Sequence, residues 1–138
     1  VDKAVSPVSK VTKVREELVA QQRKMALGKA QVMEGRDIGT VVLPLANVKI
    51  YLTASLEERA RRRVEQLKEK GILVDLKTIV AEIKRRDDID SQRALAPLRK
   101  APDAVLIDTT SMSIEEVVQA VLDEVERRAK NCSTASPS

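Results

Sequence analysis

The order of apolar and polar positions along the chain predicts helices that alternate with short strands. Val14, Leu18 and Met25 lie on one face of a predicted helix that ends near Gly28. The apolar runs that predict strands occupy residues 30–34, 48–53 and 104–108. Because each strand is a continuous apolar run between longer helices, the pattern predicts an α/β fold whose parallel sheet is flanked by helices.

Three further helices are predicted in the rest of the chain. Ser55 with Glu58, and Ser113 with Glu116, have the spacing of capping boxes, in which each side chain bonds the backbone N–H of the other residue. The helix that begins at Ser55 ends at Gly71, and another helix follows it. The last helix has one apolar face, made of Ile114, Val117, Val118, Val121, Leu122 and Val125.

Polar residues directly follow each predicted strand. These motifs are GRDIGT at 35–40, TAS at 53–55 and DTT at 108–110. Since parallel α/β sheets bind ligands beyond the carboxyl ends of their strands, we expect the motifs to meet at one edge of the sheet. Residues 1–130 are expected to form one domain, and the polar residues 131–138 a disordered tail.

The composition excludes several classes of function. The chain has no histidine, so a histidine-based catalytic triad or a histidine-ligated zinc site is impossible. Tyr51 is the single aromatic residue and the net charge is only +4, which argues against nucleic-acid binding by base stacking. Cys132 is the single cysteine, which fits a reducing cytoplasm. No apolar run approaches the roughly 20 residues that span a bilayer, so no membrane partner is expected.

Arginine and acidic residues gather in three clusters, at 35–40, 57–63 and 85–93. Each cluster alone has a simpler explanation: a turn with a local ion pair, a solvated helix with Glu–Arg pairs at i,i+4, and a solvated turn. Arginine is also the preferred bidentate partner of phosphate, and aspartate accepts hydrogen bonds from sugar hydroxyls and exocyclic amines. Together the clusters favour phosphoryl transfer, which needs positioning and charge neutralisation rather than a protein nucleophile.

Five segments resemble the bacterial cytidylate (CMP) kinases in order and spacing. They are EGRDIGTVV at 34–42, VKIYLTAS at 48–55, EERA at 57–60, AEIKRRDD at 81–88 and RALAPL at 93–98. The resemblance extends over about residues 1–128, with small departures at Thr12, Leu43 and Gln92. One departure is large, because the motif Gly-x-x-x-x-Gly-Lys-[Ser/Thr] that cradles ATP phosphates is absent. The chain therefore looks like the C-terminal portion of such a kinase.

The resemblance implies part of a P-loop nucleoside monophosphate kinase fold, with a helical lid at about 55–71. The implied reaction transfers a phosphoryl group from ATP to CMP, and to dCMP, giving CDP and ADP. Mg²⁺ would accompany ATP, with its ligands outside this chain. A missing N-terminal segment or a partner chain would be needed to complete the sheet.

The family pattern also implies roles for individual residues. The cytosine ring would be read by Ser6, Arg15 and Asp37, the acceptor phosphate held by Arg36 and Arg93, and the sugar held by Arg86 and Asp90. The lid would bring Arg59, Arg62 or Arg63 onto the transferring phosphoryl group.

Two other functions stay open on the sequence. The chain could belong to a kinase for another nucleoside monophosphate, against which Ser6, Arg15 and Asp37 argue weakly. It could also be a non-catalytic helical module that binds RNA or protein through the arginine-rich helix. Such a module would cluster Lys and Arg without interleaved acids, whereas this helix alternates them with Glu57, Glu58 and Glu65.

Overall fold

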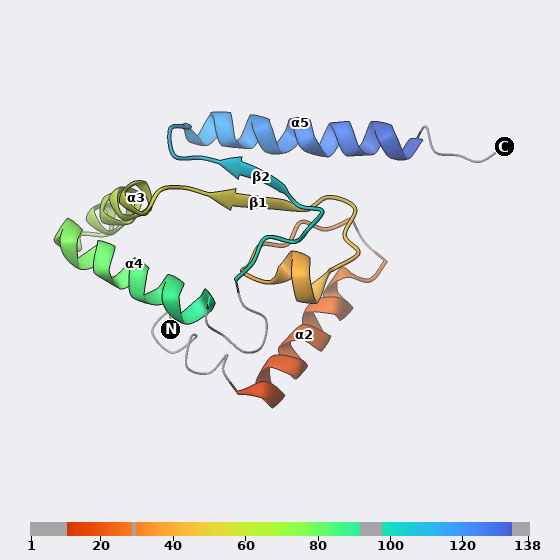
Figure 1. Ribbon diagram of the computed structural model, residues 1–138, viewed down its shortest axis with the longest axis horizontal. Coiled ribbons are helices and arrows are strands. Elements are labelled where there is room, and N and C mark those ends of the chain that lie inside the picture. Colours follow the sequence, from red (N-terminus) through yellow and green to blue (C-terminus); the bar gives the residue numbers. More distant parts are fainter. Residues whose placement is uncertain (1–10, 29, 92–97, 134–138) are drawn as a thin grey trace.

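In the computed structural model, residues 11–28, 30–91 and 98–133 are described, with side chains as far as residue 130. The described elements follow one another along the chain in the order shown in Figure 1. They are α2 (Thr12–Ala26), the π-helical turn η1 (Ile38–Val42), β1 (Ile50–Thr53), α3 (Leu56–Glu69), α4 (Leu76–Ser91), β2 (Val105–Asp108) and α5 (Ile114–Ser133). The mixture of helices with a parallel strand pair confirms the predicted α/β class.

The two strands form a parallel sheet with Ile50 opposite Val105 and Thr53 opposite Asp108. The backbone of Thr109 extends the pairing past the end of β2, because its N–H donates to the carbonyl oxygen of Thr53 at 2.8 Å. Since both strands run in the same direction, α3 and the loop before α5 leave the sheet at the same edge. The predicted strands at 48–53 and 104–108 are confirmed from Ile50 and Val105 to their last residues.

The predicted helix starts agree with the structure, one of them in full. Ser113 and Glu116 form a reciprocal capping box: the Glu116 N–H donates to Ser113 Oγ at 3.2 Å, and the Ser113 N–H donates to Glu116 Oε2 at 2.7 Å. At α3 only half of the box forms, because Ser55 Oγ accepts from the Glu58 N–H at 3.1 Å. The carboxylate of Glu58 bonds arginine side chains instead, so its role was only partly predicted.

The predicted helix ends are also confirmed. Gly28 follows α2 and Gly71 follows α3, with φ angles of +70° and +74°. Glycine adopts this left-handed conformation without a steric penalty, which is why it ends helices so often. The last helix is longer than expected, since α5 continues to Ser133 and includes the first residues of the predicted tail. The rest of that tail, 134–138, lies outside the described residues.

The predicted strand at 30–34 is wrong. These residues adopt no regular secondary structure, and the side chain of Val32 is fully exposed. A strand needs a neighbour to pair its backbone N–H and C=O groups, and no described strand lies beside this segment. The apolar residues after it form the tight turn η1 instead, in which the N–H groups of Val41 and Val42 donate to the carbonyl oxygen of Asp37.

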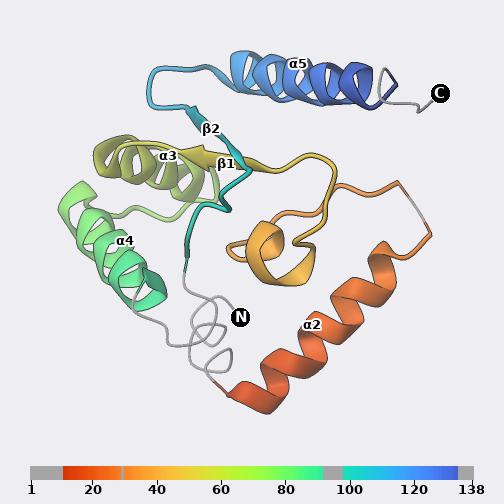
Figure 2. The same ribbon diagram turned by 45° about the vertical axis from the view of Figure 1, so that its right-hand side comes forward.

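Helices α3 and α4 lie side by side, whereas η1 lies between α2 and the strands (Figures 1 and 2). Few apolar side chains are buried among the described residues: Val42, Ala60, Ile79 and Ala101. Much of the apolar face of α5 is exposed, with Ile114 at 79% and Leu122 at 49%. Within the described part of the chain, no helix combines the length and the apolar character required to cross a membrane.

Candidate functional site

Helix α2 is held against η1 by one arginine near its C-terminal end. Arg23 donates from Nη2 to the carbonyl oxygen of Val41 at 2.6 Å and from Nε to that of Val42 at 3.0 Å. An open hollow of about 490 Å³ lies here, lined by Thr12, Arg15, Glu16, Val19, Ala20, Arg23 and Val41. The arrangement places Arg15, on the same helix, beside the loop that precedes η1.

Arg15 forms an ion pair with Asp37, which lies at the start of η1. Both side chains are mostly buried, with exposed fractions of 14% and 17%. The backbone carbonyl of Asp37 accepts from the N–H of Val41 at 2.9 Å, so the residue is held by its main chain as well. The structure therefore brings together two of the three residues predicted to read the base; Ser6 lies outside the described residues.

The neighbouring residue Arg36 forms an ion pair with Asp90 of α4. The Asp90 side chain is 1% exposed and that of Arg36 is 33% exposed, so the pair lies at the border between protein and solvent. Arg86, predicted to hold the sugar with Asp90, lies one turn earlier on α4 with its side chain exposed. Arg93, the second predicted phosphate ligand, lies outside the described residues.

The three polar motifs do not meet at one edge of the sheet, so that expectation is wrong. A Cβ on Gly39 would lie 3.5 Å from Lys49 Cδ and 3.8 Å from Ala101 Cβ, and both of these residues precede the strands. The motif at 35–40 lies apart from the other two because residues 30–34 form no strand. Without that strand, nothing aligns the motif with the ends of β1 and β2. Only the motifs at 53–55 and 108–110 meet, through the bond from the Ser55 N–H to Thr110 Oγ1 at 2.9 Å.

Helix α4 connects the two groups of predicted site residues. Asp90 holds Arg36, as described above, and Asp87, almost one turn earlier on α4, accepts from Nη1 of Arg59 at 2.6 Å. Arg59 lies on α3, the predicted lid, so α4 contacts both this helix and the loop that precedes η1. The Nε of Arg59 is buried and has no partner among the described residues, which leaves part of its donor capacity unused.

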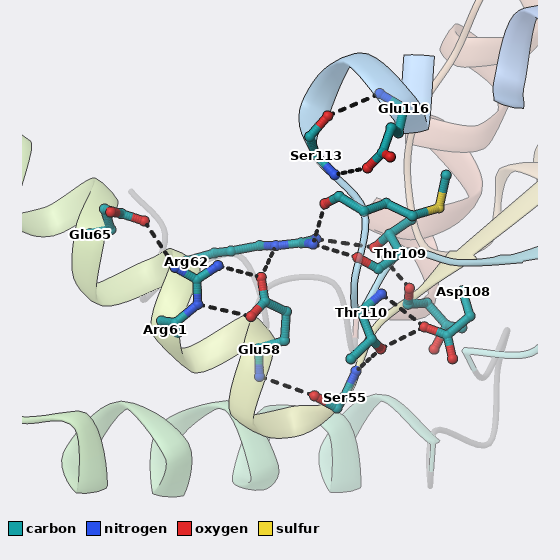
Figure 3. A network of polar contacts seen from close by, with 12 residues as sticks. Ser55, Glu58, Arg61, Arg62, Glu65, Asp108, Thr109, Thr110, Ser113 and Glu116 are labelled. Carbon is teal, nitrogen blue, oxygen red and sulfur yellow. Dashed lines mark hydrogen bonds and ion pairs between the residues drawn. The ribbon is translucent and has the colours of Figure 1, made fainter. Parts of the chain in front are cut away.

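The other two predicted lid arginines differ in their surroundings. Arg63 is exposed, and among the described contacts it donates only to Gln66 Oε1 on its own helix, at 2.5 Å. Arg62 reaches from α3 to the end of β2, where it donates to the side chain and the carbonyl oxygen of Thr109 (Figure 3). These two arginines therefore point to different surroundings: one to solvent and one to the sheet.

Glu58 lies between two of the α3 arginines (Figure 3). It accepts from Arg61 at 2.8 and 2.9 Å and from Nε of Arg62 at 2.7 Å. The hydrogen bonds from Arg61, followed by the one from Arg62, lower the pKa of Glu58 from its ordinary value of 4.5 to about 2. The carboxylate is therefore ionised throughout the physiological range.

Sequence reasoning assigned no site role to three residues that contact the predicted lid arginines. These are Glu58, Asp87 and Thr109. Thr109 had a signal, since it directly follows a strand, and Asp87 lies in one of the arginine-rich clusters. The position of Glu58, three residues after Ser55, indicated helix capping instead.

The described residues contain no group of three or more Asp, Glu or Cys side chains that could hold a metal ion. Aspartate and glutamate oxygens are the side-chain ligands that Mg²⁺ prefers. The acids of the site are engaged instead with arginines, as in the pairs Arg15–Asp37 and Arg36–Asp90.

Comparisons with known proteins find one family over nearly the whole chain. The family model described as cytidylate kinase matches residues 1–127. Similar curated proteins include the cytidylate kinases of Geobacillus kaustophilus (strain HTA426), 59% identical over 128 residues, and Enterococcus faecalis (strain ATCC 700802 / V583), 56% identical over 128 residues. Each match covers 93% of this chain and 57% of the relative.

A third relative, the cytidylate kinase of Alkaliphilus oremlandii (strain OhILAs), is 56% identical over 123 residues, which cover 89% of this chain and 57% of that protein. The chain thus spans little more than half the length of these relatives, and it matches the C-terminal part of the family. The model match over nearly the whole chain, together with these identities, confirms the resemblance drawn from the five sequence segments. The chain belongs to the cytidylate kinase family.

Proposed function

We propose that this chain supplies the acceptor side and the lid of an enzyme that transfers a phosphoryl group from ATP to CMP, and to dCMP, giving CDP and ADP. The observation that carries the proposal is the pair of adjacent residues Arg36 and Asp37, which form ion pairs with Asp90 and Arg15. Two guanidinium and two carboxylate groups are thereby joined through the adjacent residues Arg36 and Asp37. They come from α2, from α4 and from the loop between α2 and η1.

The chemistry of cytosine fits the Arg15–Asp37 pair. Its exocyclic amine can donate to a carboxylate, and its ring nitrogen N3 and carbonyl oxygen O2 can accept from a guanidinium. Ion pairing between the two side chains orients each group before the base arrives, which lowers the cost of ordering them on binding. Ser6 would add a hydroxyl contact to the same base.

The acceptor phosphate and the sugar would be bound next to the base. Arg36 is 33% exposed and can turn one edge of its guanidinium toward a phosphate, with Arg93 as the second donor. Asp90 and Arg86, on one face of α4, would bind the sugar hydroxyls. Charge neutralisation of this kind, with positioning, is what phosphoryl transfer requires from a protein.

On the donor side, Arg59, Arg62 or Arg63 of α3 would face the transferring phosphoryl group, where positive charge stabilises the transition state. Mg²⁺ would neutralise the ATP phosphates when bound, with its ligands contributed from outside this chain. We assign the ATP-cradling loop to a further segment or to a partner chain, because the glycine motif for it is absent from this sequence.

The same further segment or partner would complete the sheet. β1 and β2 are the only strands in the described ranges, and Leu52 and Leu106 expose 52% and 55% of their surface. Parallel sheets are normally covered on both faces, so this exposure supports the proposal. The location that we propose is the cytoplasm, because the single cysteine cannot form an internal disulfide.

The proposal is tested by grafting these 138 residues onto the N-terminal part of the Geobacillus kaustophilus relative and measuring ADP release with CMP, dCMP, UMP and AMP. We expect turnover with CMP and dCMP to exceed that with UMP and AMP. A preference for another monophosphate would assign the chain to a different nucleoside monophosphate kinase. Absence of turnover together with salt-dependent RNA binding would favour the helical binding module.

A further inference from the structure

Arg62 differs from the other α3 arginines because each nitrogen of its guanidinium has a protein acceptor. Nε donates to Glu58 Oε1 at 2.7 Å, and Nη1 donates to Thr109 Oγ1 at 3.1 Å. Nη2 donates to the carbonyl oxygen of Thr109 at 2.5 Å and lies 3.4 Å from that of Met112. Four of its five N–H donors thus have acceptors, which leaves a phosphoryl oxygen one N–H of Nη1 unless it displaces an acceptor.

Thr109, which accepts hydrogen bonds from Arg62, is itself bonded to the sheet. It is 5% exposed, and both its N–H and its hydroxyl donate to the carbonyl oxygen of Thr53, at 2.8 and 3.0 Å. Thr53 is the last residue of β1, and Thr109 directly follows β2. Arg62 therefore connects α3 to both strands at the edge where the chain enters the helix.

A second contact holds the start of the same helix (Figure 3). The Ser55 N–H donates to Thr110 Oγ1 at 2.9 Å, and that hydroxyl donates to Asp108 Oδ1 at 2.5 Å. Ser55 and Arg62 are nearly two helical turns apart, so the two contacts together fix both the position and the direction of α3. A single contact would leave the helix free to pivot.

We infer that Arg62 is a positioning residue: it anchors α3 to the sheet edge so that Arg59 and Arg63 lie correctly for the transferring phosphoryl group. The inference rests on the proposed function. Arg59 retains a buried Nε without a described partner, and Arg63 is exposed, so both retain donors for a phosphate. Small errors in the placement of such groups cost catalysis strongly, which gives the anchor a measurable effect.

The test compares Arg62→Met, Thr109→Val and the double variant in the grafted full-length kinase, with kcat and the KM for CMP measured well below each melting temperature. We expect Arg62→Met to lower kcat by about tenfold or more, with the KM for CMP unchanged. Thr109→Val should have a smaller effect, because the backbone acceptor of Arg62 remains. In the Arg62→Met background, Thr109→Val should add almost nothing, since contacting residues are not additive.

Matched variants distinguish the positioning role of Arg62 from a general effect of removing a positive charge from α3. Arg61→Met removes a guanidinium that also bonds Glu58 but is 63% exposed, and we expect kcat to stay within about twofold of the parent. Arg62→Lys should not rescue, because a lysine lacks the planar fork that bonds two acceptors, whereas Thr109→Ser should retain most of the kcat.

Two results would overturn the inference. If Arg62→Met lowered kcat by orders of magnitude while Thr109→Val matched the parent, Arg62 would contact the phosphoryl group itself. If both variants lowered only the melting temperature, the contact would be merely structural. A parent without CMP-dependent ADP release would instead overturn the proposed function, and the inference with it.

Discussion

Arg15 and Asp37 form an ion pair across 22 residues of sequence, with both side chains less than one-fifth exposed. Asp37 is followed directly by η1, and its neighbour Arg36 is bound to Asp90. The acceptor site that we propose is therefore built from alternating charges that already satisfy one another. Removing one member leaves a partly buried charge without its partner, which makes the pair suitable for mutational tests.

Asp37→Ala should weaken CMP binding more than it destabilises the fold. A hydrogen bond to a charged group is worth about 1.5–3 kcal/mol, which corresponds to a roughly 10- to 150-fold rise in Kd. The measurement is a calorimetric titration of CMP into the grafted full-length kinase, with melting temperatures recorded in parallel.

Asp103→Ala is the matched control, because Asp103 also pairs with a cation, Lys49, but is 59% exposed and lies outside the proposed site. Its CMP affinity should equal that of the parent. An Asp37→Ala protein with unchanged CMP affinity and a sharply lower melting temperature would make the Arg15–Asp37 pair purely structural.

Arg59→Ala and Arg63→Ala should each lower kcat without changing the KM for CMP. An arginine that contacts a transferring phosphoryl group contributes by orders of magnitude to kcat, whereas loss of an exposed ion pair costs roughly 0–1 kcal/mol of stability. Steady-state kinetics of the two variants, with Arg61→Ala alongside, separates these cases. Values of kcat within twofold of the parent for both variants would identify α3 as a solvated helix with no catalytic role.

A polypeptide of only these 138 residues should show no measurable CMP kinase activity. The reason is the missing glycine-rich phosphate loop, since arginines on α3 alone cannot fix the ATP phosphates. A coupled assay of ADP release measures this, with the graft onto the relative's N-terminal part as the positive control. Turnover of the 138-residue polypeptide comparable with that of the graft would refute the assignment of ATP binding to another segment.

The stability contributed by Glu58 should depend on pH in the acid range. Its pKa in the folded chain is about 2, against an ordinary value of 4.5, mainly because Arg61 donates to it. A carboxylate whose pKa is lowered by folding stabilises the fold above its unfolded value, and this contribution is lost as pH falls from about 4.5 toward 2. The melting temperature of Glu58→Gln should therefore be below that of the parent at pH 7, and the two should converge toward pH 2.

Thermal melts of the grafted kinase at a series of pH values give the comparison. Glu65→Gln serves as the control, because Glu65 is 66% exposed and lies 3.6 Å from the same Arg61. It should differ little from the parent at any pH. A Glu58→Gln difference that stayed constant from pH 7 to 2 would contradict the proposed origin of the effect.

A preparation of residues 1–138 alone should not behave as a well-folded monomer. Few apolar side chains are buried, whereas Leu52 and Leu106 of the strands and Leu122 of α5 are about half exposed. Domains are stable by only about 5–15 kcal/mol, and so much exposed apolar surface favours association or loose packing. Size-exclusion chromatography measures the oligomeric state, and circular dichroism measures the thermal unfolding. A monomer with a cooperative melt would show that the exposed apolar faces of the strands and of α5 need no further segment to cover them.

Local features of the chain could be predicted because they depend on neighbouring residues. The capping box of Ser113 and Glu116 and the glycine ends at Gly28 and Gly71 follow from bonds and backbone preferences within one helical turn. The five family segments could be identified for the same reason, since their order and spacing are properties of the sequence. The residues that the arginines in these segments contact could not be predicted from the sequence.

Tertiary structure alone decided which charges meet. Arg36 contacts Asp90 across 54 residues, and Arg62 contacts Thr109 across 47. The first contact depends on the position of the loop before η1 relative to α4, and the second on the pairing of β2 with β1. The segment at 30–34 also depends on tertiary structure, because it lacks a described strand to pair with. Its residues are suited to a strand, but a strand forms only where a neighbour can pair its backbone groups, and the sequence of a segment does not contain that neighbour.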